Sequence, residues 1–269
     1  MKRYAFKPII AIITLLVMAT SCKEDKKKTN ETENEPAKET VNANKITLEK
    51  LQGSPTYAEA VLELNKPATE TISNGDEVDF TFTVNNYELG AQTQGPNNEL
   101  LANSAKGQHI HFILNNQPYS AHYEAEFKKE IPDGTHHLVA FLSRSYHESV
   151  KNDNSVVVKK LQGGDETTQE LDMDAPTLIY SRPKGEYSGE DTENLLLDFF
   201  VLNTQLAENG NKVRATINEE EFIITQWAPH VVKGLPMGEV TIKLELIDDA
   251  GNLIPGPFNT VTRAVMLKK

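Results

Sequence analysis

The chain carries one series of alternating segments twice, and this duplication limits its fold more than any other feature. Residues 76–89 (DEVDFTFTVNNYEL) align with residues 193–206 (ENLLLDFFVLNTQL), with apolar side chains at every second position of both. Three further pairs of segments follow in the same order: 107–114 with 210–217, 131–142 with 235–246, and 155–160 with 264–269. Four matched pairs in one order predict duplication of a module of roughly 100 residues.

A period of two indicates strands with one buried face, and turn residues such as Asn74-Gly75 separate the segments. No long stretch has the 3.6-residue period of a helix. We therefore predict an all-β fold of two tandem immunoglobulin-like β-sandwiches. The expected boundaries are residues 45–161 for a histidine-rich first domain, 162–174 for a linker and 175–269 for the second domain.

The N-terminus has the pattern of a bacterial lipoprotein signal. Basic residues precede an apolar run at 9–18, and small residues lead to Cys22, the single cysteine. This resembles a lipobox, although Ala19 stands where that pattern prefers leucine. We expect a signal peptide at 1–21, cleavage before Cys22 and attachment of diacylglycerol and palmitate there. The alternatives are an uncleaved anchor helix and a plain signal peptide.

Residues 22–44 contain almost no large apolar side chain, which predicts a disordered tether. The sequence Lys23-Glu24-Asp25 resembles the short signal of lipoproteins sent to the outer face of the Bacteroidota outer membrane. We expect an outer-membrane location, and both the cell surface and the periplasmic face stay open.

Charge and motifs exclude several function classes. The formal net charge of −12 argues against nucleic acid as a partner, because a phosphate backbone needs a basic patch. The sequence has no G-x-S-x-G, no phosphate-cradling glycine loop and no Rossmann fingerprint. We therefore expect a protein that is not an enzyme.

The second copy predicts which faces the first copy buries. In the aligned strands, His109 and His111 occupy the positions of Lys212 and Arg214, whose charges must face water. We therefore expect the two imidazoles side by side on an outer, solvent-facing sheet surface.

The next strand also turns apolar side chains outward. Val139 and Phe141 replace the cations and anions that the second copy shows to water, and His136 is expected inward. An outward apolar pair beside histidines indicates a binding face, or a face covered by the second module or by the insertion at residues 90–106.

Six of the seven histidines lie in the first copy, and this asymmetry between the copies is the most informative chemical feature of the sequence. H-x-H on a strand plus a histidine on a neighbouring strand suits zinc or copper. The candidate ligands are His109, His111 and His137, with His122 and His147 as additional candidates. The alternative is surface histidines without a ligand. No other cofactor is expected.

A second polar cluster follows the same strand. Arg144, Tyr146 and Lys151 are candidates for binding an anion such as phosphate, and the alternative is a solvated hairpin loop.

The stretches GQHIHFILNNQPYSAHYE and GTHHLVAFLSRSYHESVK resemble uncharacterised lipoproteins of Flavobacteria and their relatives, some of them labelled phosphopeptide-binding proteins. The resemblance implies an envelope protein and carries no established catalytic residue. We predict a lipid-anchored module that binds a ligand or partner through the histidine-rich face of its first domain. The alternatives are a copper- or zinc-handling protein and a structural accessory subunit of an outer-membrane complex.

Overall fold

The computed structural model describes residues 45–72, 77–165, 168 and 170–269. The expected signal peptide, Cys22 and the tether lie outside these residues. Within the described ranges, no helix combines the length and the apolar character that crossing a bilayer requires.

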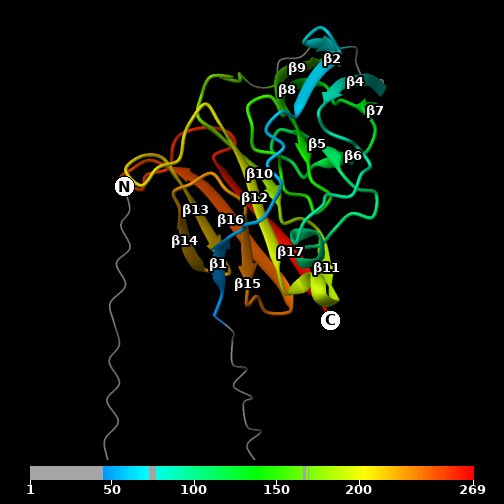
Figure 1. Ribbon diagram of the computed structural model, residues 1–269. Coiled ribbons are helices and arrows are strands. Elements are labelled where there is room, and N and C mark those ends of the chain that lie inside the picture. The colour runs from blue at the N-terminus through cyan, green and yellow to red at the C-terminus, as the bar shows by residue number, and fades with distance from the viewer. Residues whose placement is uncertain (1–44, 73–76, 166–167, 169) are drawn as a thin grey trace, which may run out of the picture. The chain divides into compact units, whose positions relative to one another are not determined.

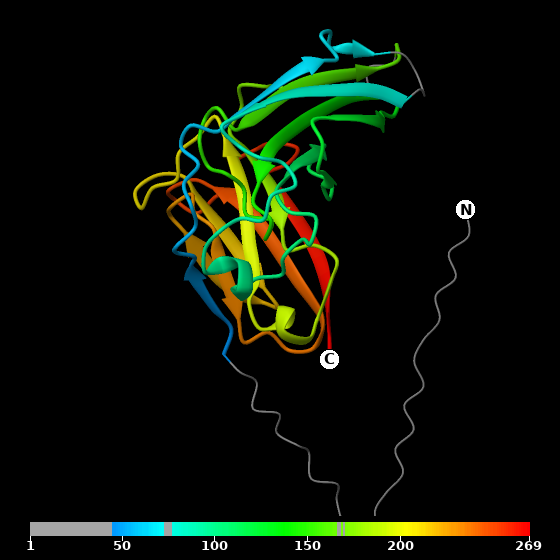
Figure 2. The same ribbon diagram turned by 45° about the vertical axis from the view of Figure 1, so that its right-hand side comes forward.

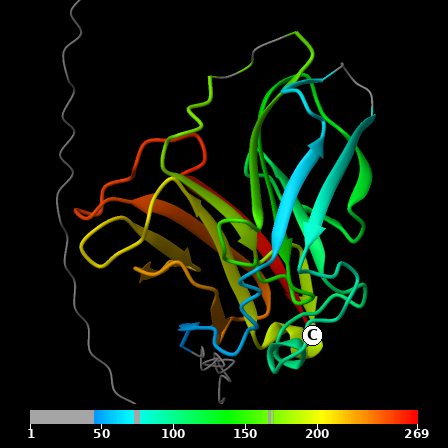
Figure 3. The same ribbon diagram turned by 45° about the horizontal axis from the view of Figure 1, so that its top comes forward.

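The first copy forms a sandwich of two sheets, in which β2 and β4 run side by side (Figure 3). One sheet has the order β2-β4-β7 and the other β3-β9-β8-β5-β6. The strands are β2 (Val61–Lys66), β3 (Thr71–Ile72), β4 (Glu77–Asn85), β5 (His109–Leu114), β6 (Ser120–His122), β7 (Glu126–Glu130), β8 (Gly134–Ser143) and β9 (Val156–Gly163).

The second copy repeats this topology (Figure 1). Its sheets have the orders β1-β15-β12-β10 and β11-β17-β16-β13-β14, and β11 pairs with β17 in parallel as β3 does with β9. The all-β, immunoglobulin-like prediction is confirmed. The strands are β1 (Thr47–Lys50), β10 (Thr177–Arg182), β11 (Glu186–Ser188), β12 (Leu195–Leu202), β13 (Lys212–Ile217), β14 (Glu220–Ile224), β15 (His230–Lys233), β16 (Gly238–Ile247) and β17 (Thr260–Lys268).

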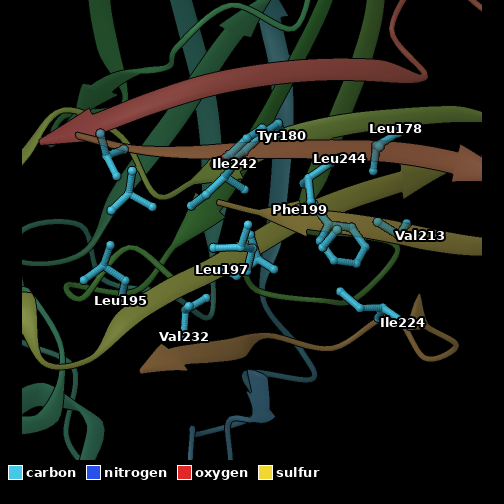
Figure 4. Packing of buried hydrophobic residues seen from close by; sticks show 14 of the residues in the cluster. Leu178, Tyr180, Leu195, Leu197, Phe199, Val213, Ile224, Val232, Ile242 and Leu244 are labelled. Atoms are coloured by element: carbon cyan, nitrogen blue, oxygen red, sulfur yellow. The ribbon is translucent and has the colours of Figure 1, made fainter. Parts of the chain in front are cut away.

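Each sandwich has its own apolar core, built from the alternation that the sequence shows. In the second copy, Val213 and Ile242 point inward together with Leu197 and Phe199 of the facing sheet (Figure 4). In the first copy, Phe80 packs with the inward residues of β5 and β8, which are Ile110, Phe112, Leu138, Ala140 and Leu142. The inward assignment of His136 also agrees, since it lies two residues before the inward Leu138 on β8.

The structure differs from the expected domain boundary at its first strand. β1 pairs antiparallel with β15, with Thr47 opposite Lys233, so these residues complete a sheet of the second sandwich. Ile46 is buried in the second core. The edge of β15 offers unpaired backbone groups that β1 satisfies, which period-two alternation cannot reveal.

A third apolar cluster covers the outward face of β5 and β8, within the single compact unit to which both sandwiches belong. Val139 and Phe141 are fully buried there against Ile179, Phe200 and Leu202 of the second copy. The structure therefore favours the alternative of a face covered by the second module. The insertion adds the short helix α1 (Asn97–Leu100; teal coil in Figure 2), followed by Leu101, which packs in a fourth cluster.

Candidate metal centre

His109 and His111 lie on β5 and project from the same face, because they are two residues apart on one strand. The alternate residues, Ile110 and Phe112, fill the core of the first sandwich. The rings were expected to face solvent, but both residues are 0% exposed. The comparison with the second copy therefore predicted the correct side of the sheet for both histidines. It did not predict that other parts of the chain cover this side.

The third imidazole comes from the loop that follows β8. A turn closes when the backbone N–H of His147 donates to the carbonyl of Arg144 at 2.8 Å, and His147 has a φ of 70°. This turn brings the ring of His147 to 4.9 Å from that of His109, between centroids.

The three side chains direct one nitrogen each toward a common point. His109 Nε2 lies 2.9 Å from His111 Nε2 and 3.1 Å from His147 Nδ1. All three of these atoms lie within 4.8 Å of one another. Among the described residues, this cluster contains three imidazoles and no carboxylate.

Partners on the far side of two rings determine which nitrogen is available. His109 Nδ1–H donates to the carbonyl of Gly107 at 2.8 Å, so a neutral ring carries its lone pair on Nε2. His111 Nδ1 lies 3.1 Å from Ser181 Oγ on β10. The serine hydroxyl accepts from Nδ1–H in one tautomer of His111, and Nε2 is then free to bind a metal. In the other tautomer the hydroxyl donates to the unprotonated Nδ1.

Gly107 must be a glycine for this arrangement. Its φ is +84°, and a Cβ added there would lie 2.3 Å from the carbonyl oxygen of Gly90. The carbonyl that orients His109 is therefore fixed by a close approach of two backbone segments.

Aromatic and cationic side chains enclose the cluster. The ring of Tyr119 stacks on His111 at 3.5 Å between centroids, and its hydroxyl lies 3.2 Å from His147 Nδ1. Lys184 Nζ lies 3.9 Å from the Tyr119 centroid, and Arg182 Cζ lies 5.4 Å from it. Both cations belong to the second copy, so the centre combines groups from the two sandwiches.

Burial keeps the imidazoles neutral. Burial lowers the pKa of His109 to about 4, although the hydrogen bond to the Gly107 carbonyl acts in the opposite direction. Burial also lowers the pKa of His111 well below the usual range. The pKa of His147 is lowered by burial first and by the Arg182 charge second. Neutral imidazole is the form that binds a metal.

The other candidate histidines lie elsewhere. His137 is opposite Lys160 in the β8–β9 ladder, and its ring stacks on Phe258 rather than on the cluster. In the β5–β8 register His111 faces Phe141, four residues from His137, so the proposed grouping of His137 with His111 is wrong. His122 stacks on Phe127 and is not among the converging ligands.

The candidate anion site already has internal partners. Arg144 pairs with the buried Glu148 at 3.0 Å, and Tyr146 donates to Ser54 Oγ. Lys151 Nζ lies 2.5 Å from Asp198 Oδ1. Because both cations are neutralised within the fold, the structure contradicts an anion site at these residues.

Sequence reasoning missed the roles of Tyr119 and Ser181. Tyr119 is near the H-x-H motif along the chain, but its position after β5 carries no information about which face its ring covers, and Ser181, 70 residues from His111, reaches the motif only through the contact between the sandwiches. His147 was included only as an additional ligand, because a loop position carries no face information.

No protein-family model matches this chain, and no curated protein sequence matches it. Solved structures match it in part. The fibronectin(III)-like modules of CbhA from Clostridium thermocellum are 13% identical, cover 77% of this chain and 94% of their own, and give a TM-score of 0.27. SGBP-B from a Bacteroides ovatus glucan utilization locus, solved with a mixed-linkage heptasaccharide, is 10% identical, with 77% and 70% covered and a TM-score of 0.23. The tandem V-type regions of the chitin-binding protein VCBP3 are 8% identical, with 78% and 100% covered and a TM-score of 0.22.

Proposed function

We propose that this protein binds one copper or zinc ion through His109, His111 and His147. The observation that carries the proposal is the convergence of three neutral imidazole nitrogens within 4.8 Å. Imidazole suits both metals, and the proposal replaces binding through an exposed histidine-rich face, since that face is covered.

The spacing of the nitrogens supports a metal centre. Tetrahedral zinc binds imidazole at about 2.0–2.1 Å, which separates two ligand nitrogens by about 3.3–3.4 Å. The separations of 2.9 and 3.1 Å need to widen by a few tenths of an ångström, and the third separation, between the nitrogens of His111 and His147, lies within 4.8 Å and has to close to the same value. The hydrogen bonds of His109 to Gly107 and of His111 to Ser181 are of the kind that orient metal ligands from behind.

Metal content and thermal stability test this function. We expect the chain without its signal peptide and without a histidine tag to bind one equivalent of Cu or Zn. At a free metal concentration 100 times Kd, binding stabilises the folded state by about 2.7 kcal/mol, which raises Tm. Absence of stoichiometric binding for both metals, with Tm unchanged, would refute the proposal.

Variants separate the centre from the other histidines. His147→Asn removes the imidazole and keeps a residue that tolerates the positive φ of this position. It should abolish the rise in Tm on adding metal, as should His109→Gln. The matched control is His122→Gln, which removes a histidine of the same sandwich outside the cluster and should leave binding intact.

We further propose that the metal-binding sandwiches are attached to the outer membrane through lipid on Cys22. The signal-like N-terminus and the resemblance to flavobacterial lipoproteins support this location. A tethered protein of this kind can deliver its metal ion to a partner in the envelope. In that case it would act as an accessory subunit of an envelope complex.

A further inference from the structure

We infer that the centre binds copper as Cu⁺ in preference to divalent ions, and that Arg182 and Lys184 of the second sandwich set this preference. The inference rests on the proposed metal-binding function and names the ion that the same three imidazoles select. Its basis is the position of two positive side chains beside a ligand set that contributes no negative charge.

The ligand set offers three uncharged donors. Among the described residues, the cluster of His109, His111 and His147 includes no carboxylate and no thiolate. An imidazole binds a metal in its neutral form, so these ligands leave the whole charge of the ion in place. Zn²⁺ in structural sites is almost always bound by four ligands, whereas the soft ion Cu⁺ is commonly satisfied by two or three. Three imidazoles therefore suit Cu⁺ without any further donor.

Two cations of the second sandwich lie close to the aromatic ring that covers His111. The ring of Tyr119 stacks on His111 at 3.5 Å between centroids, and Lys184 Nζ lies 3.9 Å from the Tyr119 centroid. Arg182 Cζ lies 5.4 Å from the same centroid. Because His111 covers one face of the Tyr119 ring, the ammonium of Lys184 lies over the other face, and a single ring separates it from a candidate ligand.

Neither cation is neutralised by a carboxylate. Arg182 Nη1 donates to the hydroxyl of Tyr187 at 2.9 Å, and Lys184 Nζ donates to the backbone carbonyl of Tyr119 at 2.6 Å. No ion pair among the described residues includes Arg182 or Lys184. Burial lowers the pKa of Lys184 to about 8, so its amine is still mostly protonated at pH 7. The centre therefore lies beside two positive charges.

Burial strengthens the repulsion between these charges and a bound ion. His109 and His111 are 0% exposed and Arg182 is 8% exposed, so water screens little of the interaction. Glu148, which follows the third imidazole along the chain, does not offset the repulsion, because it is paired with Arg144 at 3.0 Å. The repulsion is proportional to the charge of the ion, so a divalent ion is disfavoured twice as strongly as Cu⁺ at the same position.

Affinities for the two copper ions and for zinc test the preference. The chain without its signal peptide and without a histidine tag is titrated at pH 7 with Cu⁺ under anaerobic conditions, and separately with Cu²⁺ and Zn²⁺, each in competition with a chelator. We expect the dissociation constant for Cu⁺ to be lower than those for Cu²⁺ and Zn²⁺ by about tenfold or more. A tenfold preference for Cu⁺ over Cu²⁺ raises the reduction potential of the bound copper by about 59 mV relative to the aqueous couple.

Lys184→Met shows whether charge causes the preference. Loss of one positive charge should raise the affinity for both copper ions, and the gain for Cu²⁺ should be the square of the gain for Cu⁺. A gain of roughly threefold for Cu⁺ would thus accompany roughly tenfold for Cu²⁺. Lys184→Arg keeps the charge and should keep the wild-type ratio of affinities.

Lys106→Met is the matched control. Lys106 Nζ lies 5.4 Å from the centroid of Tyr123, whose ring is 5.0 Å from that of His109, but Lys106 is exposed. Water screens an exposed charge, so this variant should leave both copper affinities unchanged.

The inference is overturned when wild type binds Cu²⁺ or Zn²⁺ as tightly as Cu⁺. It is also overturned when Lys184→Met changes the affinities for Cu⁺ and Cu²⁺ by one common factor, because a loss of packing acts on both ions alike. A chain that binds none of the three ions would instead refute the proposed function.

Discussion

The strongest stability prediction concerns the buried ion pair between Asp198 and Lys151. Asp198 is 0% exposed, and its Oδ1 lies 2.5 Å from Lys151 Nζ while its Oδ2 accepts from the backbone N–H of Ser149 at 3.1 Å. Asp198→Asn keeps the shape of the side chain and removes the countercharge of an ammonium whose side chain is 13% exposed. Breaking a buried pair in this way costs about 3–5 kcal/mol.

The matched control is a second lysine–carboxylate pair of the same chain. Glu49 and Lys233 are 2.7 Å apart but expose 56% and 42% of their side chains. Glu49→Gln should therefore cost less than about 1 kcal/mol, because water screens an exposed pair.

Urea denaturation followed by circular dichroism measures both costs. Asp198→Asn should lower the free energy of unfolding by several times as much as Glu49→Gln, and its Tm should fall by about 6 to 20 °C. Adding Lys151→Met to Asp198→Asn should restore part of the loss, because the unpaired charge is gone. Equal costs for the two single variants would show that burial does not control the strength of these pairs.

Two further predictions follow from burial at His137 and from the cysteine of the signal. Burial lowers the pKa of His137 to about 4, so between pH 6.5 and 4 the unfolded chain binds more protons than the folded one, and stability is lost as the pH falls through this window. The loss is about 2 kcal/mol at pH 5, and His137→Gln should show a correspondingly weaker pH dependence in urea denaturation; identical pH profiles would contradict this. Cys22→Ser removes the sulfur that we propose to carry the lipid, so palmitate labelling in cells should disappear, and persistent labelling would exclude this anchor.

The periodicity of the sequence predicted the strands and their inward faces. Alternation in β13 and β16 is unambiguous because Lys212 and Lys243 cannot be buried without partners, and the alignment carries this assignment over to β5 and β8. The correct placement of His109 and His111 on one face follows from this comparison.

The sequence could not show what covers that face. An outward apolar pair such as Val139 and Phe141 is expected both for a binding surface and for a contact with the second sandwich. Which of the two it forms depends on Ile179 and Phe200, more than 35 residues away along the chain. Only the packing of the two sandwiches distinguishes a binding surface from a covered contact.

The choice of candidate metal ligands shows the same limit. His137 was grouped with the H-x-H strand because it lies on a neighbouring strand, but the register places Phe141 opposite His111. The actual third imidazole, His147, depends on a turn with a positive φ.

The sequence by itself determined the duplicated sandwich fold and the concentration of histidines in one copy, because strand periodicity and residue type are local properties. The tertiary structure alone decided that His109, His111 and His147 converge beneath a second sandwich that supplies Ser181, Arg182 and Lys184. Convergence depends on register, turn geometry and contact between distant segments, which no local pattern encodes.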